Sequence, residues 1–212
     1  MTLSTDFNEY HHTIIAITGF KRSGKDTVAR IINRNLKRPF DTYAFADPVR
    51  EAAKAFFGWP DSIFGDATKE VVDEYWGISP RQALQYIGTE VGRVGFAETF
   101  PEFKRTTSGQ IWIKRFQRYV MDTPPFVDGL IVTDMRFHNE MDAVLDLKDN
   151  NFNVITIAVA RKGLGTDGHA SENEISEVMN RCQYQINNNS TLSDLEKSVS
   201  MILWNYGLLY NE

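Results

Sequence analysis

The stretch TIIAITGFKRSGKDTVARIIN, residues 13–33, decides the fold. It opens with a short apolar run, rich in isoleucine, which is typical of a buried strand. The run ends at Gly19, and a helical spacing of apolar residues begins at Val28. Gly19, Gly24 and Lys25 have the spacing G-x-x-x-x-G-K between these two patterns, so the stretch predicts a strand, a phosphate-binding loop and a helix.

The residue types of this loop suit a phosphate, although a structural turn is the alternative. Glycine adopts backbone angles that other residues resist, so Gly19 and Gly24 let the chain curl around an anion. The N–H groups of the loop and the N-terminus of the helix then face the phosphate, and Lys25 adds a positive charge. The strict motif places Ser or Thr directly after the lysine as a magnesium ligand, whereas Asp26 holds that place here and Thr27 follows.

The composition bounds the class of protein. The chain has 212 residues, of which 42% are hydrophobic, enough for one sizeable core or a core with a small lid. A net charge of −5 argues against a non-specific nucleic-acid binder. The single Cys182 excludes an intramolecular disulfide. Without an apolar run of about 18 residues or a signal peptide, we expect no membrane contact and a cytoplasmic protein.

Strand patterns alternate with helical patterns, which predicts an α/β fold with a parallel sheet flanked by helices. The expected strands are 13–18, 42–46, 129–134, 153–160 and 184–187. The expected helices are 27–36, 49–57, 80 to about 88 or weakly on to 95, 111–121, 137–148, 172–180 and 192–206. Stretches 58–77 and 96–109 are expected to be irregular. Open parallel sheets bind ligands at the carboxyl ends of their strands, where the phosphate loop lies.

Three charged residues follow later strands and each has two interpretations. Asp134 could hold magnesium directly or through water, or it could cap the next helix. Arg136 could bind a phosphate through a bidentate fork, or pair with Glu140 four residues on. Arg161 begins a basic, glycine-rich segment that could close over the transferred phosphate, or be a solvated loop.

Candidates for binding an acceptor lie in the middle of the chain. Asp47 opens a helix that carries Arg50 in its first turn, where an acceptor phosphate could dock. Trp76 and Trp112 could stack on a base, although aromatic side chains are more often core. A polar face after Pro80 could read a base edge and hold its phosphate, or be a solvated helix; its residues are Arg81, Gln85, Thr89, Glu90 and Arg93.

The loop sequence KRSGKDT, residues 21–27, resembles the phosphate loop of the deoxynucleoside monophosphate kinases of tailed bacteriophages. Weaker matches follow in the same order and span about residues 14–195. They include blocks that begin at Arg81, Asp134 and Arg161, and an asparagine-rich turn before Leu192. Asp26 after the lysine is the pattern of that family.

The resemblance implies one P-loop kinase domain over residues 1–212, with a phosphate-loop unit (13–36), an acceptor-binding helical region (about 47–122) and a lid (about 161–172). It implies transfer of the γ-phosphate of ATP to a deoxynucleoside monophosphate with Mg²⁺. The implied catalytic residues are Lys25, Arg136 and Arg161, and the implied metal ligands are Thr27 and Asp134. The implied ATP-binding residues are Gly19, Lys21, Ser23, Gly24, Lys25, Asp26, Thr27, Arg161 and Asn188. The implied acceptor-binding residues are Asp47, Arg50, Arg81, Gln85, Thr89, Glu90, Arg93, Trp112 and Arg136.

Other functions stay open at this point. A kinase of dephospho-CoA or phosphomevalonate type has the same architecture, and a nucleotide-binding ATPase module would need no acceptor. The expected partners are small-molecule nucleotides, without nucleic acid or membrane, and a homodimer is an open alternative. For a chain of phage origin, the expected location is the host cytoplasm.

Overall fold

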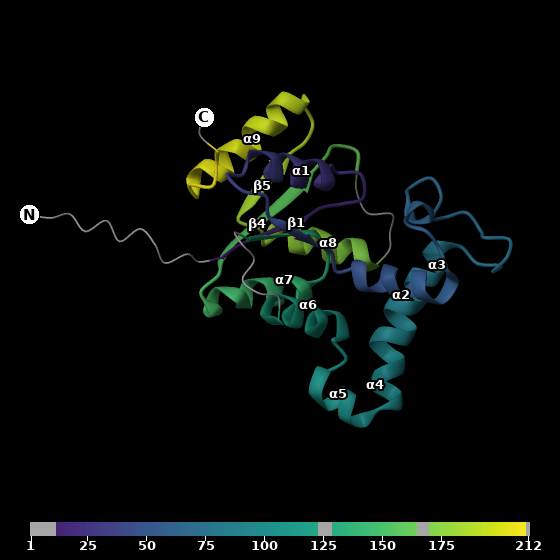
Figure 1. Cartoon of the computed structure of the whole chain (residues 1–212). Coiled ribbons are helices and arrows are strands. Elements are labelled where there is room, and N and C mark those ends of the chain that lie inside the picture. The colour runs from purple at the N-terminus through teal and green to yellow at the C-terminus, as the bar shows by residue number, and fades with distance from the viewer. Residues whose placement is uncertain (1–11, 123–128, 165–169, 211–212) are drawn as a thin grey trace, which may run out of the picture. The chain divides into compact units, whose positions relative to one another are not determined.

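The computed structural model describes residues 12–122, 129–164 and 170–210. A five-stranded sheet has the order β2-β3-β1-β4-β5, and all its neighbouring strands pair in parallel (Figure 1). The strands are β1 Thr13–Thr18, β2 Asp41–Tyr43, β3 Gly129–Met135, β4 Asn153–Ala160 and β5 Tyr184–Asn187. The predicted α/β fold class is therefore confirmed, and the chain has the P-loop type of parallel sheet flanked by helices.

The isoleucine run of β1 lies at the centre of this sheet because it can be buried on both faces. Every residue of β1 is buried. One edge of β1 pairs with β3 and the other with β4. Parallel strands covered on both faces are typically such continuous apolar runs. The carboxyl end of β1 therefore delivers the phosphate loop to the middle of the sheet edge.

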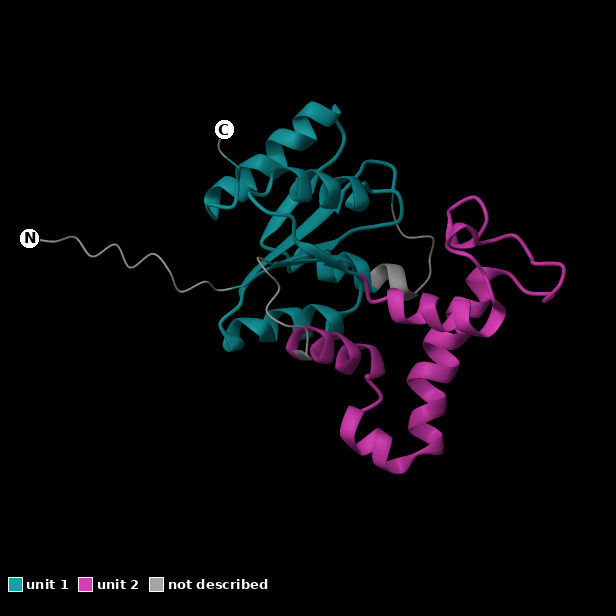
Figure 2. Cartoon of the chain, viewed as in Figure 1, with its two compact units in different colours: residues 1–43, 123–212 teal, residues 44–122 magenta. Residues whose placement is uncertain are grey.

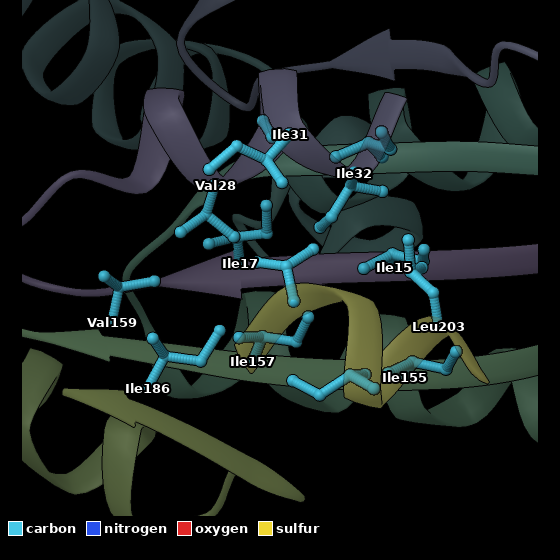
Figure 3. Packing of buried hydrophobic residues seen from close by; sticks show 14 of the residues in the cluster. Ile15, Ile17, Val28, Ile31, Ile32, Ile155, Ile157, Val159, Ile186 and Leu203 are labelled. Carbon is cyan, nitrogen blue, oxygen red and sulfur yellow. The ribbon is translucent and has the colours of Figure 1, made fainter. Parts of the chain in front are cut away.

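Helices cover both faces of the sheet. Helices α1 (Lys25–Asn35) and α9 (Leu192–Asn205) lie on one face, and α7 (His138–Leu145) and α8 (Ala170–Asn180) lie on the other (Figure 1). Because strand side chains alternate, every second residue of β1 and β4 reaches α1 and α9. The main core packs there (Figure 3); its residues include Ile15, Ile17, Val28, Ile31, Ile32, Ile155, Ile157, Val159, Ile186 and Leu203.

The chain divides into two compact units (Figure 2). Residues 1–43 and 123–212 form unit 1, which contains the sheet, and residues 44–122 form unit 2. Unit 2 is helical, and its core joins Val49, Ala53, Trp59, Ala83 and Ile87. Its elements are α2 Asp47–Phe57, η1 Asp61–Phe64, α3 Pro80–Gln85, η2 Tyr86–Gly95, α4 Phe96–Thr99, α5 Pro101–Thr107 and α6 Ile111–Asp122.

Several expected element boundaries were wrong. The second strand starts one residue earlier than expected and ends at Tyr43. The stretch 96–109 is not irregular, because α4 continues the preceding helical run and Pro101 opens α5. Proline suits the first turn of a helix, where its missing N–H is not needed. A short 3₁₀-helix, η3 Asp146–Asn150, follows α7. Within the described ranges, no helix is long and apolar enough to cross a membrane.

Candidate functional site

The loop between β1 and α1 has the backbone of an anion cradle. Gly19, Arg22 and Gly24 have positive φ angles of 148°, 65° and 103°. A Cβ atom at Gly19 would collide with the carbonyl oxygen of Val159, and one at Gly24 would collide with the side-chain amide of Asn188. Glycine is therefore needed at both positions for its backbone angle and for its lack of a side chain. Successive N–H groups in such a curled loop form a concave site for an anion.

Two side chains inside the loop suit an incoming phosphate. Ser23 is fully buried, and its hydroxyl has no hydrogen-bond partner among the described residues. A buried polar atom without a partner is costly and often marks the place of a water or a ligand. Lys25 is the first residue of α1, and its Nζ donates a hydrogen bond to the carbonyl oxygen of Phe20 at 2.9 Å. The ammonium group is thus held beside the loop, where a phosphate could attract it.

Asp26 and Thr27 continue the first turn of α1. The Asp26 side chain is exposed, and Lys21 in the loop is exposed as well. The Thr27 hydroxyl accepts a hydrogen bond from the Arg30 guanidinium at 3.2 Å. The hydroxyl keeps a second lone pair for another contact. The predicted roles of these residues in binding ATP therefore remain compatible with the local geometry.

Asp134 lies near the carboxyl end of β3, next to the start of the phosphate loop. The β1–β3 register is regular up to Ala16 and Val132, and then pairs Thr18 with Met135. Strand β3 therefore contains one extra residue at this point, which is the pattern of a β-bulge. Bulges redirect side chains and occur often beside active sites. The half-buried Asp134 carboxylate thus belongs to the sheet edge from which the phosphate loop leaves.

Arg136 follows β3 and its backbone is held by a buried carboxylate. Oε2 of Glu140, which is 3% exposed, accepts hydrogen bonds from the backbone N–H groups of Arg136 at 2.7 Å and Phe137 at 3.2 Å. This contact replaces the ion pair between the Arg136 and Glu140 side chains that was one of two sequence-based interpretations. The Arg136 guanidinium is exposed and makes no hydrogen bond or ion pair within the described residues.

Arg161 and Asn188 follow β4 and β5, so both lie at the same edge of the sheet as the phosphate loop. The Arg161 side chain is exposed and has no hydrogen bond or ion pair within the described part of the chain. Nδ2 of Asn188 donates to the carbonyl oxygen of Ser23 at 2.8 Å. The adjacent Asn189 accepts from the backbone N–H of Lys162 at 2.6 Å. The lid predicted over about 161–172 includes residues 165–169, which lie outside the described ranges.

The oxygen donors at this edge suit magnesium. Mg²⁺ is usually bound by one or two carboxylates with substrate phosphates and water, so it needs no cage of protein ligands. Asp134 and Thr27 offer a carboxylate and a hydroxyl. Among the described residues, no group of three or more His, Cys, Asp or Glu side chains could hold a metal ion by itself. A metal held here would therefore depend on nucleotide phosphates.

The predicted acceptor-binding residues other than Arg136 all lie in unit 2. Arg50 pairs with Asp47 at 2.8 Å. Asp47 also accepts a hydrogen bond from the backbone N–H of Ala44, and Ala46 is the N-cap residue of α2. Nε of Arg81 lies 3.3 Å from the Glu70 carboxylate. These arginines are already oriented by neighbouring acids.

One helical run carries the remaining acceptor candidates of this unit. Helix α3 passes without a break into the wide π-helix η2 and then into α4. Gln85, Thr89 and Glu90 are exposed along it, and Arg93 is half-buried. The backbone N–H of Phe96 bonds the carbonyl oxygen of Val91, five residues earlier, as a π-helix requires. Such wide turns are rare and occur frequently at functional sites.

The tryptophans of unit 2 are used in its packing. The Trp112 indole N–H donates to the carbonyl oxygen of Gly88 at 2.8 Å, and its ring lies against Gly92. The Trp76 indole N–H donates to the carbonyl oxygen of Phe57 at 3.1 Å. Both rings thus have structural contacts, and a role in stacking on a base stays a prediction.

The structure places the phosphate loop, Asp134, Arg136, Arg161 and Asn188 in unit 1, at or just beyond the carboxyl ends of its strands. Sequence reasoning did not assign the backbone contacts of Glu140 or the contact of Asn189. Only the position of Asn189 in an asparagine-rich turn hinted at its contact, because asparagine side chains often bond nearby backbone groups.

Comparison with known proteins identifies the family. A model of the deoxynucleotide monophosphate kinase family matches residues 13–59, which include β1, the phosphate loop and α1. A protein of Acanthamoeba polyphaga mimivirus, assigned as a deoxynucleotide monophosphate kinase, is 30% identical over 182 residues. The match covers 82% of this chain and 88% of the viral protein. The chain belongs to the deoxynucleotide monophosphate kinase family.

Solved structures of other kinases show weaker likeness to this family member. Shikimate kinase from Aquifex aeolicus is 13% identical, with a TM-score of 0.45 over 92% of this chain and 96% of that chain. Dephospho-CoA kinase from Campylobacter jejuni is 13% identical, with a TM-score of 0.44 over 91% and 96%. Likeness at this level carries no inference about substrate. Family membership rests on the viral relative and makes the chain a nucleotide kinase.

Proposed function

We propose that this protein transfers the γ-phosphate of ATP to a deoxynucleoside monophosphate, with Mg²⁺, and releases ADP and a deoxynucleoside diphosphate. An oxygen of the acceptor phosphate forms a bond to the γ-phosphorus, and the bond from that phosphorus to the β,γ-bridging oxygen breaks. Phosphoryl transfer of this kind needs little covalent help from a protein, because positioning and charge neutralisation supply most of the catalysis.

The observation that carries the proposal is the loop at residues 19–25. It combines two glycines at positive φ, a buried serine hydroxyl that has no partner among the described residues, and a lysine at the start of a helix. The helix N-terminus and the curled backbone favour negative charge, and Lys25 can reach the terminal phosphates. Within a family of nucleotide kinases, these features support ATP as the donor.

The other charged residues of unit 1 suit the transferring group. Arg136 and Arg161 have exposed guanidinium groups without partners in the described ranges. A guanidinium can bind two phosphate oxygens at once and neutralise the charge that spreads over them during transfer. Thr27 and Asp134 would hold the magnesium ion, which would supply further charge neutralisation when bound with ATP.

Unit 2 supplies the acceptor side of the proposal. Arg50 and Arg81 would bind the acceptor phosphate, and the polar side chains of α3 and η2 would read the base. The two arginines are oriented by Asp47 and Glu70, which limits the freedom that binding would remove. This region (44–122) is a separate compact unit, as a substrate-binding insertion would be.

A panel of acceptors tests the proposal. The purified chain is incubated with radiolabelled ATP, Mg²⁺ and one acceptor at a time, and labelled products are separated. We expect label in dGMP, dTMP or dCMP. Transfer only to dephospho-CoA or phosphomevalonate would favour the alternative kinase. ATP hydrolysis that no monophosphate changes would indicate an ATPase module.

Lys25→Ala is the matching variant, and Lys37→Ala is its control because Lys37 is exposed just beyond α1. We expect Lys25→Ala to lower transfer by about 100-fold or more, since it removes a positive charge from the transferring phosphate. Lys37→Ala should behave as wild type. Near-normal transfer by Lys25→Ala would show that Lys25 and its loop take no part in phosphoryl transfer.

A further inference from the structure

The turn after β5 joins two segments that are far apart in the sequence. Asn188 donates its side-chain amide to the carbonyl oxygen of Ser23 in the phosphate loop at 2.8 Å. Asn189 accepts the backbone N–H of Lys162, next to Arg161, at 2.6 Å. The backbone N–H of Asn188 also bonds the carbonyl oxygen of Ala160 at 2.7 Å. The side-chain amides of Asn188 and Asn189 therefore contact the two segments that carry Lys25 and Arg161, the positively charged residues of the proposed reaction.

The hydrogen bond from Asn188 to Ser23 is closely packed and admits one orientation of the Asn188 amide. A Cβ atom added to Gly24 would collide with the Asn188 amide, so this side chain lies directly against the loop. Ser23 is fully buried, which excludes water from the carbonyl oxygen as an easy substitute partner. A carbonyl oxygen accepts hydrogen bonds and cannot donate them, so the NH₂ group of Asn188 must face it. Conversely, a backbone N–H donates and cannot accept, so the side-chain oxygen of Asn189 must face the N–H of Lys162.

We propose that Asn188 and Asn189 are positioning residues that hold the phosphate loop in place relative to residues 161–164, the Arg161 segment. We call this pair of contacts the brace. This inference rests on the proposed function, and it gives Asn188 a role other than direct contact with ATP. Asn188 holds the backbone that surrounds the phosphates of the nucleotide. Asn189 holds the start of the segment from which Arg161 reaches the transferring phosphate. Misplacing either segment by a small distance lowers the rate of transfer.

The chemistry of the two contacts predicts opposite effects for the same substitution. Aspartate has no amide hydrogen, so Asn188→Asp would place a carboxylate against the Ser23 carbonyl oxygen. Asn189→Asp keeps an oxygen that accepts the Lys162 N–H. Asn187→Asp is the charge-matched control, because Asn187 is the exposed last residue of β5 and makes no side-chain hydrogen bond in the described chain.

The first experiment measures ADP binding by titration calorimetry in the full chain. We expect Asn188→Asp to weaken ADP binding by about tenfold or more, the effect of losing one hydrogen bond and gaining a repulsion. Asn187→Asp should change ADP binding little. Equal weakening by these two variants would overturn the role of Asn188, since charge alone would then explain it.

The second experiment compares Asn189→Ala with Asn189→Asp. We expect Asn189→Ala to lower kcat with little change in the KM for ATP, because Arg161 acts mainly on the transition state. It should also speed amide hydrogen exchange at Lys162. Asn189→Asp should restore both towards wild type. Equal kcat and equal exchange in wild type and Asn189→Ala would overturn the role of Asn189.

The outcomes separate this inference from the proposed function. Wild-type transfer with unaffected Asn188 and Asn189 variants would contradict the brace and leave the kinase reaction in place. A wild-type chain that transfers no phosphate and binds no ADP would contradict the proposed function. Exchange at Lys162 would then still decide whether Asn189 holds this segment, because that readout needs no nucleotide.

Discussion

Gly24 is the residue at which the phosphate loop tolerates least change. Its φ of 103° is unfavourable for any L side chain, and a Cβ would also strike the Asn188 amide. We expect Gly24→Ala to lower the free energy of unfolding by more than the cost of the backbone angle alone, which is about 1–2 kcal/mol, and to abolish ADP binding. Urea unfolding and calorimetry measure the two effects.

Gly207→Ala is the control for this substitution. Gly207 also has a positive φ, 65°, but none of the described residues has an atom within 4 Å of the position that its Cβ would take. We expect Gly207→Ala to show only the cost of the backbone angle and to bind ADP normally. Similar losses of stability in both variants, with ADP binding intact, would show that the Asn188 contact imposes no constraint on the loop.

Single residues also show where sequence reasoning reaches its limit. Gly19, Gly24 and Lys25 could be identified because a loop motif fixes their spacing locally. The contact of Asn189 with Lys162 joins residues 27 positions apart, and no local pattern encodes such a contact. Glu140 was considered as an ion-pair partner of Arg136, whereas its carboxylate accepts the backbone N–H groups. Helical spacing placed the two residues together but could not distinguish side-chain from backbone contact.

At the level of elements, the π-helix η2 depends on the fit between Gly92 and Trp112. A Cβ at Gly92 would lie 2.5 Å from Cζ2 of the indole. We expect Gly92→Ala to lower the free energy of unfolding by about 1–3 kcal/mol, the usual cost of overpacking. Adding Trp112→Phe, which shortens the ring, should recover part of that loss, so the two effects should not add.

A double-mutant cycle by urea unfolding measures this coupling. Gly65→Ala is the control, because a Cβ there would meet its nearest neighbour at 3.4 Å, an ordinary contact. It should change stability little, and its effect should add to that of Trp112→Phe. Additive losses for the Gly92 and Trp112 substitutions would contradict the proposed fit.

The segment between α2 and α3 should be sensitive to acid through Asp73. The Trp59 indole N–H donates to the Asp73 carboxylate at 2.7 Å, and the backbone N–H groups of Tyr75 and Trp76 donate to it as well. The Trp59 hydrogen bond, supported by the backbone N–H groups, lowers the pKa of Asp73 below its ordinary value. Because the folded state prefers the charged carboxylate, the stabilisation is present at neutral pH and is lost as the pH falls below about 4.

Asp73→Asn tests this dependence by urea unfolding at a series of pH values. We expect the variant to be less stable than wild type at pH 7, and the difference to shrink as the pH falls through the titration range of Asp73. A difference that stays constant with pH would show that the carboxylate charge does not stabilise this segment.

The elements differ in how well their sequence predicts them. The strands β1 and β4 have the expected bounds because buried parallel strands are short, apolar and separated from helical patterns. The edge strand β5 also has the expected bounds, although Ile186 is its one buried residue. Helices α4 and α5 were missed because Gly95, Pro101 and Gly109 suggested an irregular stretch. Gly95 is helical here, and Pro101 begins a helix instead of ending one. Because no residue of α5 is buried, its start at Pro101 follows a local helix signal that was read as a break.

For the whole molecule, the division into two compact units separates the proposed roles. The phosphate loop and the residues that would act on the transferring phosphate lie in unit 1, whereas the other acceptor candidates lie in unit 2. The net charge of −5 is not a phosphate-binding feature by itself. Binding of a polyphosphate therefore depends on locally placed groups, above all the loop amides and Lys25.

A crystal structure of the full chain grown with ADP and Mg²⁺ tests the central claim most directly. We expect the β-phosphate to accept hydrogen bonds from the backbone N–H groups of residues 22–26. We also expect Lys25 Nζ to leave the Phe20 carbonyl oxygen, its partner here at 2.9 Å, and to contact the phosphate. A nucleotide whose phosphates lie elsewhere, with Lys25 still bonded to Phe20, would contradict the account.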